Sequence, residues 1–495
     1  MVDYLHGAYG DIQAAGTKAA VESMSAIVYI GTAPVHTLPG GAANVNKPMI
    51  VKNMADARRR FGYSDDWAAY TLCEAMFAHF EIGAAGPLVL INVLDPAKHK
   101  ADEGGSVSMK PVNGRITIAN AGDIILDSVK IEDKEKGTEY TVSYDHTKAR
   151  ITISEAETGA LGDEALTVTY DKVDPKKVAE DDLIGADDGD GLYTGLHALR
   201  NVYQLTGCIP AHLLAPGFSC KPAVHTAMIQ AAKKISGHWD AYVRADIPLT
   251  AEDGNKVKLS DAKTWKAAHG YNQPGETVYF PMAKGIDGRK YHISVLAAAG
   301  LMQLLAENDG IPYMTPSNTE CAIISNLWFG DDSDARLFDD ELVNEHLNKY
   351  GIASAAYVGG RWVIWGCHSA DYTYSEGDQI SVSETNRMML YYVSNDFQHR
   401  RNNDVDKPMT ANDIRSIVSE EQARLDALLR IGALTYGTVA FNASEDERSD
   451  IMMGDFSFAF NVTATQLAKS LTAVVNWTDK GYQTYYENFV TGGEI

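Results

Sequence analysis

The sequence predicts a multidomain α/β protein in which a small all-β unit interrupts an α/β domain. Three observations lead to this prediction. Runs of Val, Ile and Leu without alternation, such as residues 87–94, are typical of strands in a sheet that is covered on both faces. Residues 96–182 show period-two patches and no convincing helix, which is typical of an all-β unit. With 495 residues, the chain is also too long for one hydrophobic core.

The order of the predicted elements divides the chain into segments. Asp-Pro dipeptides lie at both ends of the all-β unit and are natural boundaries. The predicted segments are an N-terminal arm (1–22), the first part of the α/β domain (23–95), the inserted all-β unit (96–182), the second part of the α/β domain (183–348), a C-terminal α/β domain (349–478) and a C-terminal arm (479–495).

The α/β part opens with buried strands over residues 27–30, 48–51 and 87–94. Helices are predicted between the second and third of these strands, over 53–62 and 65–84, the first of them ending at a Gly. The inserted unit is predicted to be a small sandwich, because its short alternating strands are separated by polar turns.

The C-terminal domain contains one long amphipathic helix within residues 410–434. Thr410 and Asp413 match the start of a capping box, and Gly432 predicts the end of the helix. Its predicted buried stripe consists of Ile414, Ile417, Val418, Leu425, Leu428 and Leu429. Three arginines lie nearer the outside of this helix: Arg415, Arg424 and Arg430.

Two alternating stretches close the chain and predict two half-buried strands, around 456–464 and 471–477. Phe456, Phe458 and Phe460 share one face of the first strand, and Trp477 ends the apolar face of the second. The tail that follows, GYQTYYENF, is too aromatic for a solvated terminus. The N-terminal arm likewise carries apolar residues outside any domain pattern: Tyr4, Leu5, Tyr9 and Ile12.

A free strand exposes unpaired N–H and C=O groups and recruits another chain. One solution is that the arms complete the sheets of neighbouring copies by β-augmentation. The other is that both ends fold back on their own chain. Composition alone leaves both interpretations open.

Composition limits the partners and ligands of the chain. The net charge of −23 argues against a direct nucleic-acid partner, because affinity for phosphate depends on Lys and Arg. Five scattered cysteines fit reduced thiols in a protein made in the cytoplasm. Residues 1–13 have no apolar core, and the longest apolar run, 293–306, is shorter than the ~20 residues of a bilayer span. We therefore expect a soluble protein without a signal peptide and without membrane insertion.

No catalytic, cofactor or metal site is predicted. The spacing of one Cys/His group matches no zinc pattern: Cys208, His212, Cys220 and His225. An acidic loop lacks the Glu that a calcium loop has at its twelfth position, so its acids are expected at a helix N-terminus: Asp187, Asp188 and Asp190. Nucleophile-elbow, Walker and dinucleotide motifs are absent from the sequence, which argues against an enzyme.

Several stretches, in their order, resemble contractile phage tail sheath proteins. SAIVYIGTAP, PMIVKNMADARRRFG and LCEAMFAHFEIGAAGPLVLINVLDP are similar to the opening of that family. VTYDKVDPKKVAEDDLIGADDGDG and GIPYMTPSN resemble its Gly-Asp-Gly passage and its Pro-Ser-Asn segment. RWVIWGCHSA, NRMMLYYV and FAFNVTATQLAKSLTAVVNWT resemble its C-terminal domain. WGCHSA departs from the Arg-Thr pair that many sheaths carry after Trp-Gly.

The resemblance implies a non-enzymatic sheath subunit that needs no cofactor. Six copies would ring a tail tube, and the rings would stack helically and contract to drive the tube through a bacterial envelope. Implied partners are further copies of the chain, the tail tube protein, and baseplate and tail terminator proteins. The protein would be made in the cytoplasm of a bacterial host and assembled in a virion tail or a phage-tail-like particle.

The resemblance also implies roles for particular residues. Both arms would enter the C-terminal domains of neighbouring copies, through Tyr4, Leu5, Tyr9, Phe456, Phe458, Phe460, Trp477, Tyr482, Tyr485 and Tyr486. The long helix would face the tube through Arg415, Arg424 and Arg430, and the β insertion would lie on the outer surface. Two alternatives stay open: an adhesin-like surface-binding protein that uses the β insertion as its recognition head, and an α/β hydrolase without a recognisable motif.

Overall fold

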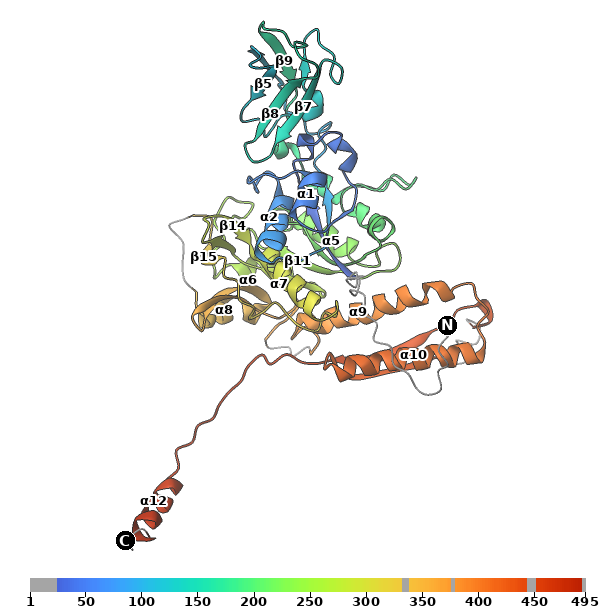
Figure 1. Cartoon of the computed structure of the whole chain (residues 1–495). Helices are drawn as coiled ribbons and strands as arrows, with labels where there is room; N and C mark the ends of the chain where they lie inside the picture. Colours follow the sequence, from blue (N-terminus) through green and yellow to red (C-terminus); the bar gives the residue numbers. More distant parts are fainter. Residues whose placement is uncertain (1–24, 332–337, 375–378, 443–450, 492–495) are drawn as a thin grey trace, which may run out of the picture.

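A computed structural model describes residues 25–331, 338–374, 379–442 and 451–491 (Figure 1). Its centre is an eight-stranded mixed sheet. In order across the sheet, the strands are β2 (Met49–Val51), β3 (Leu88–Asn92), β1 (Ser25–Gly31), β10 (Ile209–Leu214), β11 (Tyr242–Asp246), β12 (Glu276–Tyr279), β16 (Ile352–Val358) and β17 (Arg361–Trp365). The strands from β3 to β16 run parallel, and the edge strands β2 and β17 run antiparallel to their neighbours. The predicted α/β class is confirmed.

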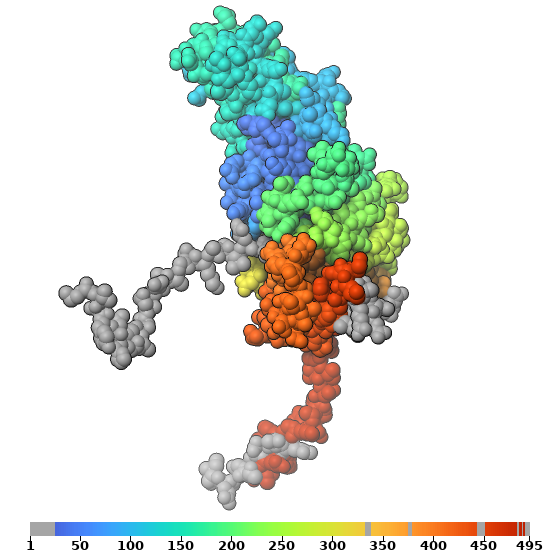
Figure 2. All heavy atoms as spheres, turned by 90° about the vertical axis from the view of Figure 1, so that its right-hand side faces the viewer, coloured from blue at the N-terminus to red at the C-terminus, as the bar shows by residue number. Residues whose placement is uncertain are grey.

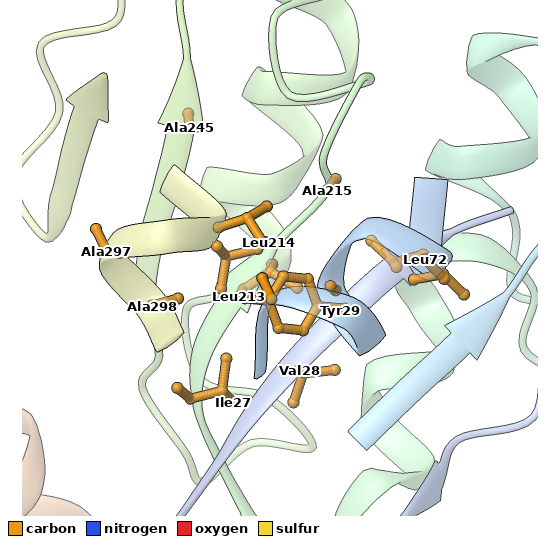
Figure 3. Close-up of a cluster of buried hydrophobic side chains, with 14 of the residues drawn as sticks. Ile27, Val28, Tyr29, Leu72, Leu213, Leu214, Ala215, Ala245, Ala297 and Ala298 are labelled. Carbon is orange, nitrogen blue, oxygen red and sulfur yellow. The ribbon is translucent and has the colours of Figure 1, made fainter. Parts of the chain in front are cut away.

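The interior of this sheet is apolar. Ile27, Val28 and Tyr29 of β1 are fully buried, and they lie close to Leu213 and Leu214 of β10 (Figure 3). The helices of this part of the chain are α1 (Met54–Phe61), α2 (Thr71–Phe77), α3 (Glu180–Ile184), α4 (Val202–Thr206), α5 (Pro222–Ala231), α6 (Ala262–Ala268), α7 (Ile293–Glu307) and α8 (Asp340–His346). Because both faces of the sheet are covered, the sequences of its strands are apolar runs without alternation.

The longest apolar run of the sequence forms α7. This helix is buried along most of its length, so its uniform hydrophobicity is that of a core helix. Among the helices in the described ranges, none combines the length and the apolar character that a bilayer span requires. A small antiparallel sheet lies in the same part of the chain and consists of β14 (Lys290–His292), β13 (Met282–Gly285) and β15 (Ile324–Trp328).

Residues 105–170 fold as two three-stranded antiparallel sheets at one end of the molecule (Figure 1). The first contains β4 (Gly105–Met109), β9 (Leu166–Tyr170) and β6 (Lys130–Ile131). The second contains β5 (Arg115–Ile118), β8 (Arg150–Glu155) and β7 (Tyr140–Asp145). Both sheets contribute to one apolar cluster, which is separate from the core of the large sheet.

The opposite end of the molecule is built from two long helices and a two-stranded sheet (Figure 1). The helices are α9 (Glu384–Arg401) and α10 (Ala411–Arg430), and the strands are β18 (Leu434–Phe441) and β19 (Phe458–Ala464). These four elements share an apolar cluster of their own, which includes Met389, Leu425, Leu428 and Val439. They are called the C-terminal unit below.

The chain after β19 differs from the prediction. Residues 471–477 form no strand, and the Tyr-rich tail forms helix α12 (Lys480–Thr491) instead of an extended arm. In both views this segment runs away from the rest of the molecule (Figures 1 and 2). From here on, the name C-terminal arm denotes residues 466–491, a segment that begins earlier than the arm predicted over 479–495. The half-buried strand expected at residues 471–477 is therefore wrong for a single subunit: the stretch is exposed and pairs with no strand in the described part of the chain.

Candidate subunit-interaction surface

Helix α10 forms the rigid base of the C-terminal unit. Its start is fixed by a capping box, in which Thr410 Oγ1 accepts from Asp413 N and the Asp413 carboxylate accepts from Thr410 N. Its end is a Schellman turn, because Gly432 has a φ of 77° and Ala433 N donates to Leu428 O at 3.0 Å. Ile417, Leu425 and Leu428 of the predicted stripe are buried. The sequence therefore predicted the position, ends and buried face of this helix.

A ladder of charged side chains joins α10 to α9. Glu421 is only 1% exposed and accepts from Arg400 Nη1 at 2.6 Å and from Arg401 Nε at 2.8 Å. Arg424 Nε donates to Asp396 Oδ2 at 2.6 Å, and this hydrogen bond raises the pKa of the Arg424 guanidinium. The two helices are therefore held in one register by hydrogen-bonded ion pairs as well as by apolar packing.

The sheet of the C-terminal unit has only two strands. β18 pairs antiparallel with β19, from Leu434 opposite Ala464 to Phe441 opposite Phe458. Within the described part of the chain, β19 pairs with no other strand, so its second edge presents open N–H and C=O groups. A two-stranded ribbon is marginally stable unless further strands or helices support it. Here α9 and α10 cover one face, and the edge of β19 remains available for another strand.

A groove of about 910 Å³ runs along the other edge of the sheet, between α10 and β18. Its apolar walls include Ile414 and Val418 of α10 and Val439 and Phe441 of β18. Gln422 lies in the same groove, with its side-chain amide against the backbone of β18. The groove is long, open and mostly apolar, which suits an extended peptide better than a compact ligand.

The C-terminal arm exposes the apolar groups that such a surface would bury. Trp477 is 80% exposed, Tyr482 67% and Phe489 68%. The apolar residues of the extended part are equally free: Leu471, Val474 and Val475. On α12, aromatic side chains recur at helical spacing and cover one face: Tyr482, Tyr485, Tyr486 and Phe489. An exposed apolar surface of this extent marks a site of interaction with another molecule.

The beginning of the C-terminal arm contacts the rest of its own subunit through Lys469. Lys469 Nζ donates to Tyr372 Oη at 3.4 Å and lies 5.8 Å from the ring centroids of both Tyr372 and Tyr374. This cation–π arrangement fixes the point at which the arm leaves its own subunit.

The predicted strand residues lie in different settings. The side chains of Phe458 and Phe460 pack against Phe397 of α9, with ring centroids 5.9 and 5.2 Å away. The ring centroids of Phe456 and Phe441 lie 6.4 Å apart. These rings are therefore used inside the subunit, and what β19 offers to a neighbour is its backbone edge. Trp477, Tyr482, Tyr485 and Tyr486 lie on the exposed arm, whereas Tyr4, Leu5 and Tyr9 lie outside the described residues.

The three arginines predicted on the outside of α10 are not equivalent. Arg415 is exposed and donates to Asn412 of its own helix at 2.7 Å, and Arg430 is exposed in the last turn. Arg424 is committed to Asp396 of α9. Arg415 and Arg430 are therefore free to meet another molecule, and Arg424 has a structural partner.

Sequence reasoning missed the polar residues that anchor the C-terminal unit to the large sheet. Arg244 of β11 and Glu384 of α9 form a fully buried ion pair, with Nη1 and Oε2 2.9 Å apart. Burial alone would lower the pKa of Arg244, but the nearby Glu384 carboxylate raises it. Thr277 and Thr315 donate to the same carboxylate at 3.0 and 2.7 Å. Neither partner stands out in the sequence, because a Glu in the first turn of a helix is common.

The residues weighed as metal ligands have other roles. His225 is hydrogen-bonded to Glu276 at 2.6 Å, and burial lowers the pKa of His212 to about 3. Asp188 accepts from the N–H groups of Asp190 and Leu192, so the acidic loop stabilises a turn. The expected helix N-terminus at these acids is wrong. Within the described residues, no group of three or more His, Cys, Asp or Glu side chains is arranged to hold a metal ion.

Comparisons in sequence relate the chain to tail sheath proteins. No protein-family model matches it. It is 30% identical over 256 residues to the tail sheath protein of Burkholderia phage BcepMu, an alignment that spans half of this chain and half of that relative. It is 20% identical over 314 residues to the major tail sheath protein of Serratia phage KSP20, covering 61% of this chain and 72% of the other.

Comparisons in structure give the same fold. The sheath of an extracellular contractile injection system, PVC, in the contracted state is 12% identical, with a TM-score of 0.53 over 97% of this chain and 100% of that chain. The contracted helical sheath of the anti-feeding prophage is 13% identical, with a TM-score of 0.50 over 96% of this chain and 99% of that chain. The resemblance to contractile tail sheath proteins is thus confirmed, as is the fold class.

Proposed function

We propose that this chain is the structural subunit of a contractile tail sheath. It polymerises around a tail tube as stacked hexameric rings and contracts to drive the tube through a bacterial envelope. The observation that supports this best is a pair of complementary defects in one subunit. The C-terminal unit has a two-stranded sheet with an open edge at β19 and an apolar groove beside the other edge, at β18. The C-terminal arm has an exposed apolar segment that packs on no strand of the described residues, and we propose that a neighbour's arm occupies the β18 groove.

Arm exchange between copies would pair the backbone of a strand edge and bury the exposed apolar segment in one step. An added strand contributes roughly five hydrogen bonds of ~0.5–1.5 kcal/mol net each. Burial of the exposed aromatic and aliphatic side chains adds roughly 25 cal/mol per Å² of apolar surface. The arm is a narrow tether that leaves the body at Lys469, so bodies linked in this way can rotate as rigid units and stay connected.

The arrangement of the units suggests how the subunit is oriented. The inserted β unit and the C-terminal unit lie at opposite ends of the molecule (Figure 1). We place the C-terminal unit toward the tube, where Arg415 and Arg430 are free to meet it, and the inserted unit on the outside. The proposed segment boundaries are 96–182 for the insertion and 349–478 for the C-terminal domain, although the first strands of the latter, β16 and β17, pair with the large sheet. Baseplate and tail terminator proteins would meet the two ends of the stack.

The proposed role requires no catalysis and no cofactor. The relatives are tail sheath proteins, which are structural. We infer that the protein is synthesised in the cytoplasm of a bacterial host and works as part of a virion tail or a phage-tail-like particle.

Electron microscopy of the purified full-length chain tests the proposal. Negative staining is expected to show rings or long hollow tubes. An adhesin would remain a small particle and would bind a surface or a glycan. A hydrolase would also remain a small particle and would turn over a substrate.

Changes in the C-terminal arm test the mechanism. Deletion of residues 482–495, or the triple substitution Trp477→Ala, Tyr485→Ala and Tyr486→Ala, is expected to leave a soluble, folded protein that no longer polymerises. Leu192→Ala is the matched control, because Leu192 is also an exposed apolar residue (67%) but lies far from the arm in sequence. Polymers of unchanged length and number after deletion of residues 471–495, which also removes the stretch 471–477, would contradict arm exchange.

A further inference from the structure

The edge of β18 that faces α10 is occupied by one side chain. Gln422 Nε2 donates to Gly437 O at 3.1 Å, and Gln422 Oε1 accepts from Val439 N at 3.1 Å. Gly437 and Val439 are alternate residues on the edge turned away from β19, since Asn442 N pairs with Ser457 O on the β19 side. A single amide therefore takes one acceptor and one donor position that the backbone of an added strand would use.

The groove beside Gln422 has room for such a strand. Its walls continue along α10 and β18 past the amide, from Ile414 and Val418 to Phe441. The occupant that fits is residues 471–477 of a second copy. This stretch is extended and exposed, alternates apolar residues, and contains no charged side chain. Its own subunit is a poor host, because the arm leaves the body at Lys469 and runs away from the C-terminal unit (Figure 2).

We propose that Gln422 is a guard residue that satisfies the β18 edge in the free subunit and is displaced when a neighbour's arm arrives. This inference rests on the proposed arm exchange and adds a regulatory step to it. An unguarded edge would recruit any extended chain. The amide holds the β18 edge through two neutral hydrogen bonds, and its Nε2 also donates to Asp426 Oδ1 of the same helix at 2.9 Å. A complete strand with apolar side chains makes more bonds to the edge than the amide does and displaces it. The guard thus sets the subunit concentration at which assembly begins.

The test compares full-length chains that differ at one glutamine. In Gln422→Ala the edge has no competitor, and the critical concentration for assembly, measured by light scattering and pelleting, is expected to fall about tenfold, equivalent to about 1.4 kcal/mol. Gln398→Ala is the matched control, because Gln398 lies on α9 and, among the described residues, its side-chain amide bonds to Ser394 of its own helix. Gln422→Met keeps the aliphatic length of the side chain but removes the amide. It replaces the Ala variant if that variant folds poorly, and the same fall in critical concentration is expected.

A second measurement follows the edge itself. In the unassembled parent chain the amide proton of Val439 is expected to be protected from hydrogen exchange, and in Gln422→Met this protection should be lost. After assembly, Val439 should be protected in both chains. An unchanged or raised critical concentration in both Gln422 variants, or equal exchange at Val439 before assembly, would overturn the guard. Absence of polymers from the parent chain itself would instead contradict the proposed sheath function.

Discussion

His292 shows how a single buried residue links the folded state to pH. Its Nδ1 lies 2.7 Å from Glu74 Oε2, and its backbone N–H donates to the other oxygen of the same carboxylate at 2.6 Å. Burial alone would lower the pKa of His292, but the charge of Glu74 outweighs this effect and raises the pKa to about 9. The imidazolium and Glu74 therefore form an ion pair between the start of α7 and helix α2.

The stability of the α/β domain is predicted to depend on this pair. The pKa of His292 in the folded state lies above the ~6.5 of an unfolded histidine, so the stabilisation is complete below pH ~6.5 and is lost as pH rises through about 9. The difference corresponds to about 3 kcal/mol. Urea unfolding of the parent chain and of His292→Gln should show a gap in unfolding free energy that narrows by about this amount between pH 6 and pH 9.5. A gap of constant size over this range would contradict the prediction.

At the scale of elements, α9 and α10 show what sequence patterns contain and what they omit. The caps and the apolar stripe of α10 are local features, so the sequence predicted them correctly. Glu421 also lies within the buried stripe, and its burial depends on Arg400 and Arg401 from another helix. A one-dimensional pattern assigns a carboxylate to solvent, because it does not show which cations lie opposite.

Breaking the Glu421 contacts should loosen the C-terminal unit. In Glu421→Ala the guanidinium groups of Arg400 and Arg401 lose their buried partner, and we expect destabilisation of about 3 kcal/mol. Glu420→Ala is the control: Glu420 is mostly exposed, makes one bond to Arg401, and should cost less than about 1 kcal/mol. Thermal unfolding followed by circular dichroism would measure both. Equal effects of the two substitutions would contradict the assigned role of Glu421.

The C-terminal arm marks the limit of prediction at the level of elements. The alternation in residues 471–477 predicts a half-buried strand, but within the described residues this stretch is exposed and pairs with no strand. The Tyr-rich tail was predicted as an extended arm, yet its aromatic residues at 482, 485, 486 and 489 follow the helical period. The helical spacing of these aromatic residues could have been recognised in the sequence. A partner for residues 471–477 could not have been predicted, because periodicity shows which face of a strand is apolar and not which strand lies beside it.

At the scale of the whole molecule, the inserted β unit is attached through one narrow neck. The chain enters and leaves it side by side, since Lys100 and Val173 form a bridge and Ala101 N donates to Lys172 O at 2.9 Å. Its apolar core is separate from that of the large sheet. The change from uniform apolar runs to period-two patches allowed this unit to be predicted. Its contacts with the body, such as His36 Nε2 to Gly122 O at 2.9 Å, join distant parts of the sequence and could not be predicted.

Removal of the inserted unit should leave a working subunit. Joining Ala101 to Lys172 through Asn-Gly would close the neck as a two-residue hairpin. We expect the shortened chain to fold and to form polymers of the same repeat with a smaller outer diameter, as seen by electron microscopy. A shortened chain that folds, as judged by circular dichroism, but does not polymerise would show that the unit belongs to the assembly contacts.

The departure of the C-terminal arm from its own body has a consequence for the finished particle. If every copy lends a segment to the next layer and receives one from the layer before, then the stack has a direction. One rim always ends in unused arms, and the other ends in unfilled grooves. Identical layers of this kind do not limit their own number. The length of the stack therefore has to be set by a different protein, which either measures the length or ends the growth.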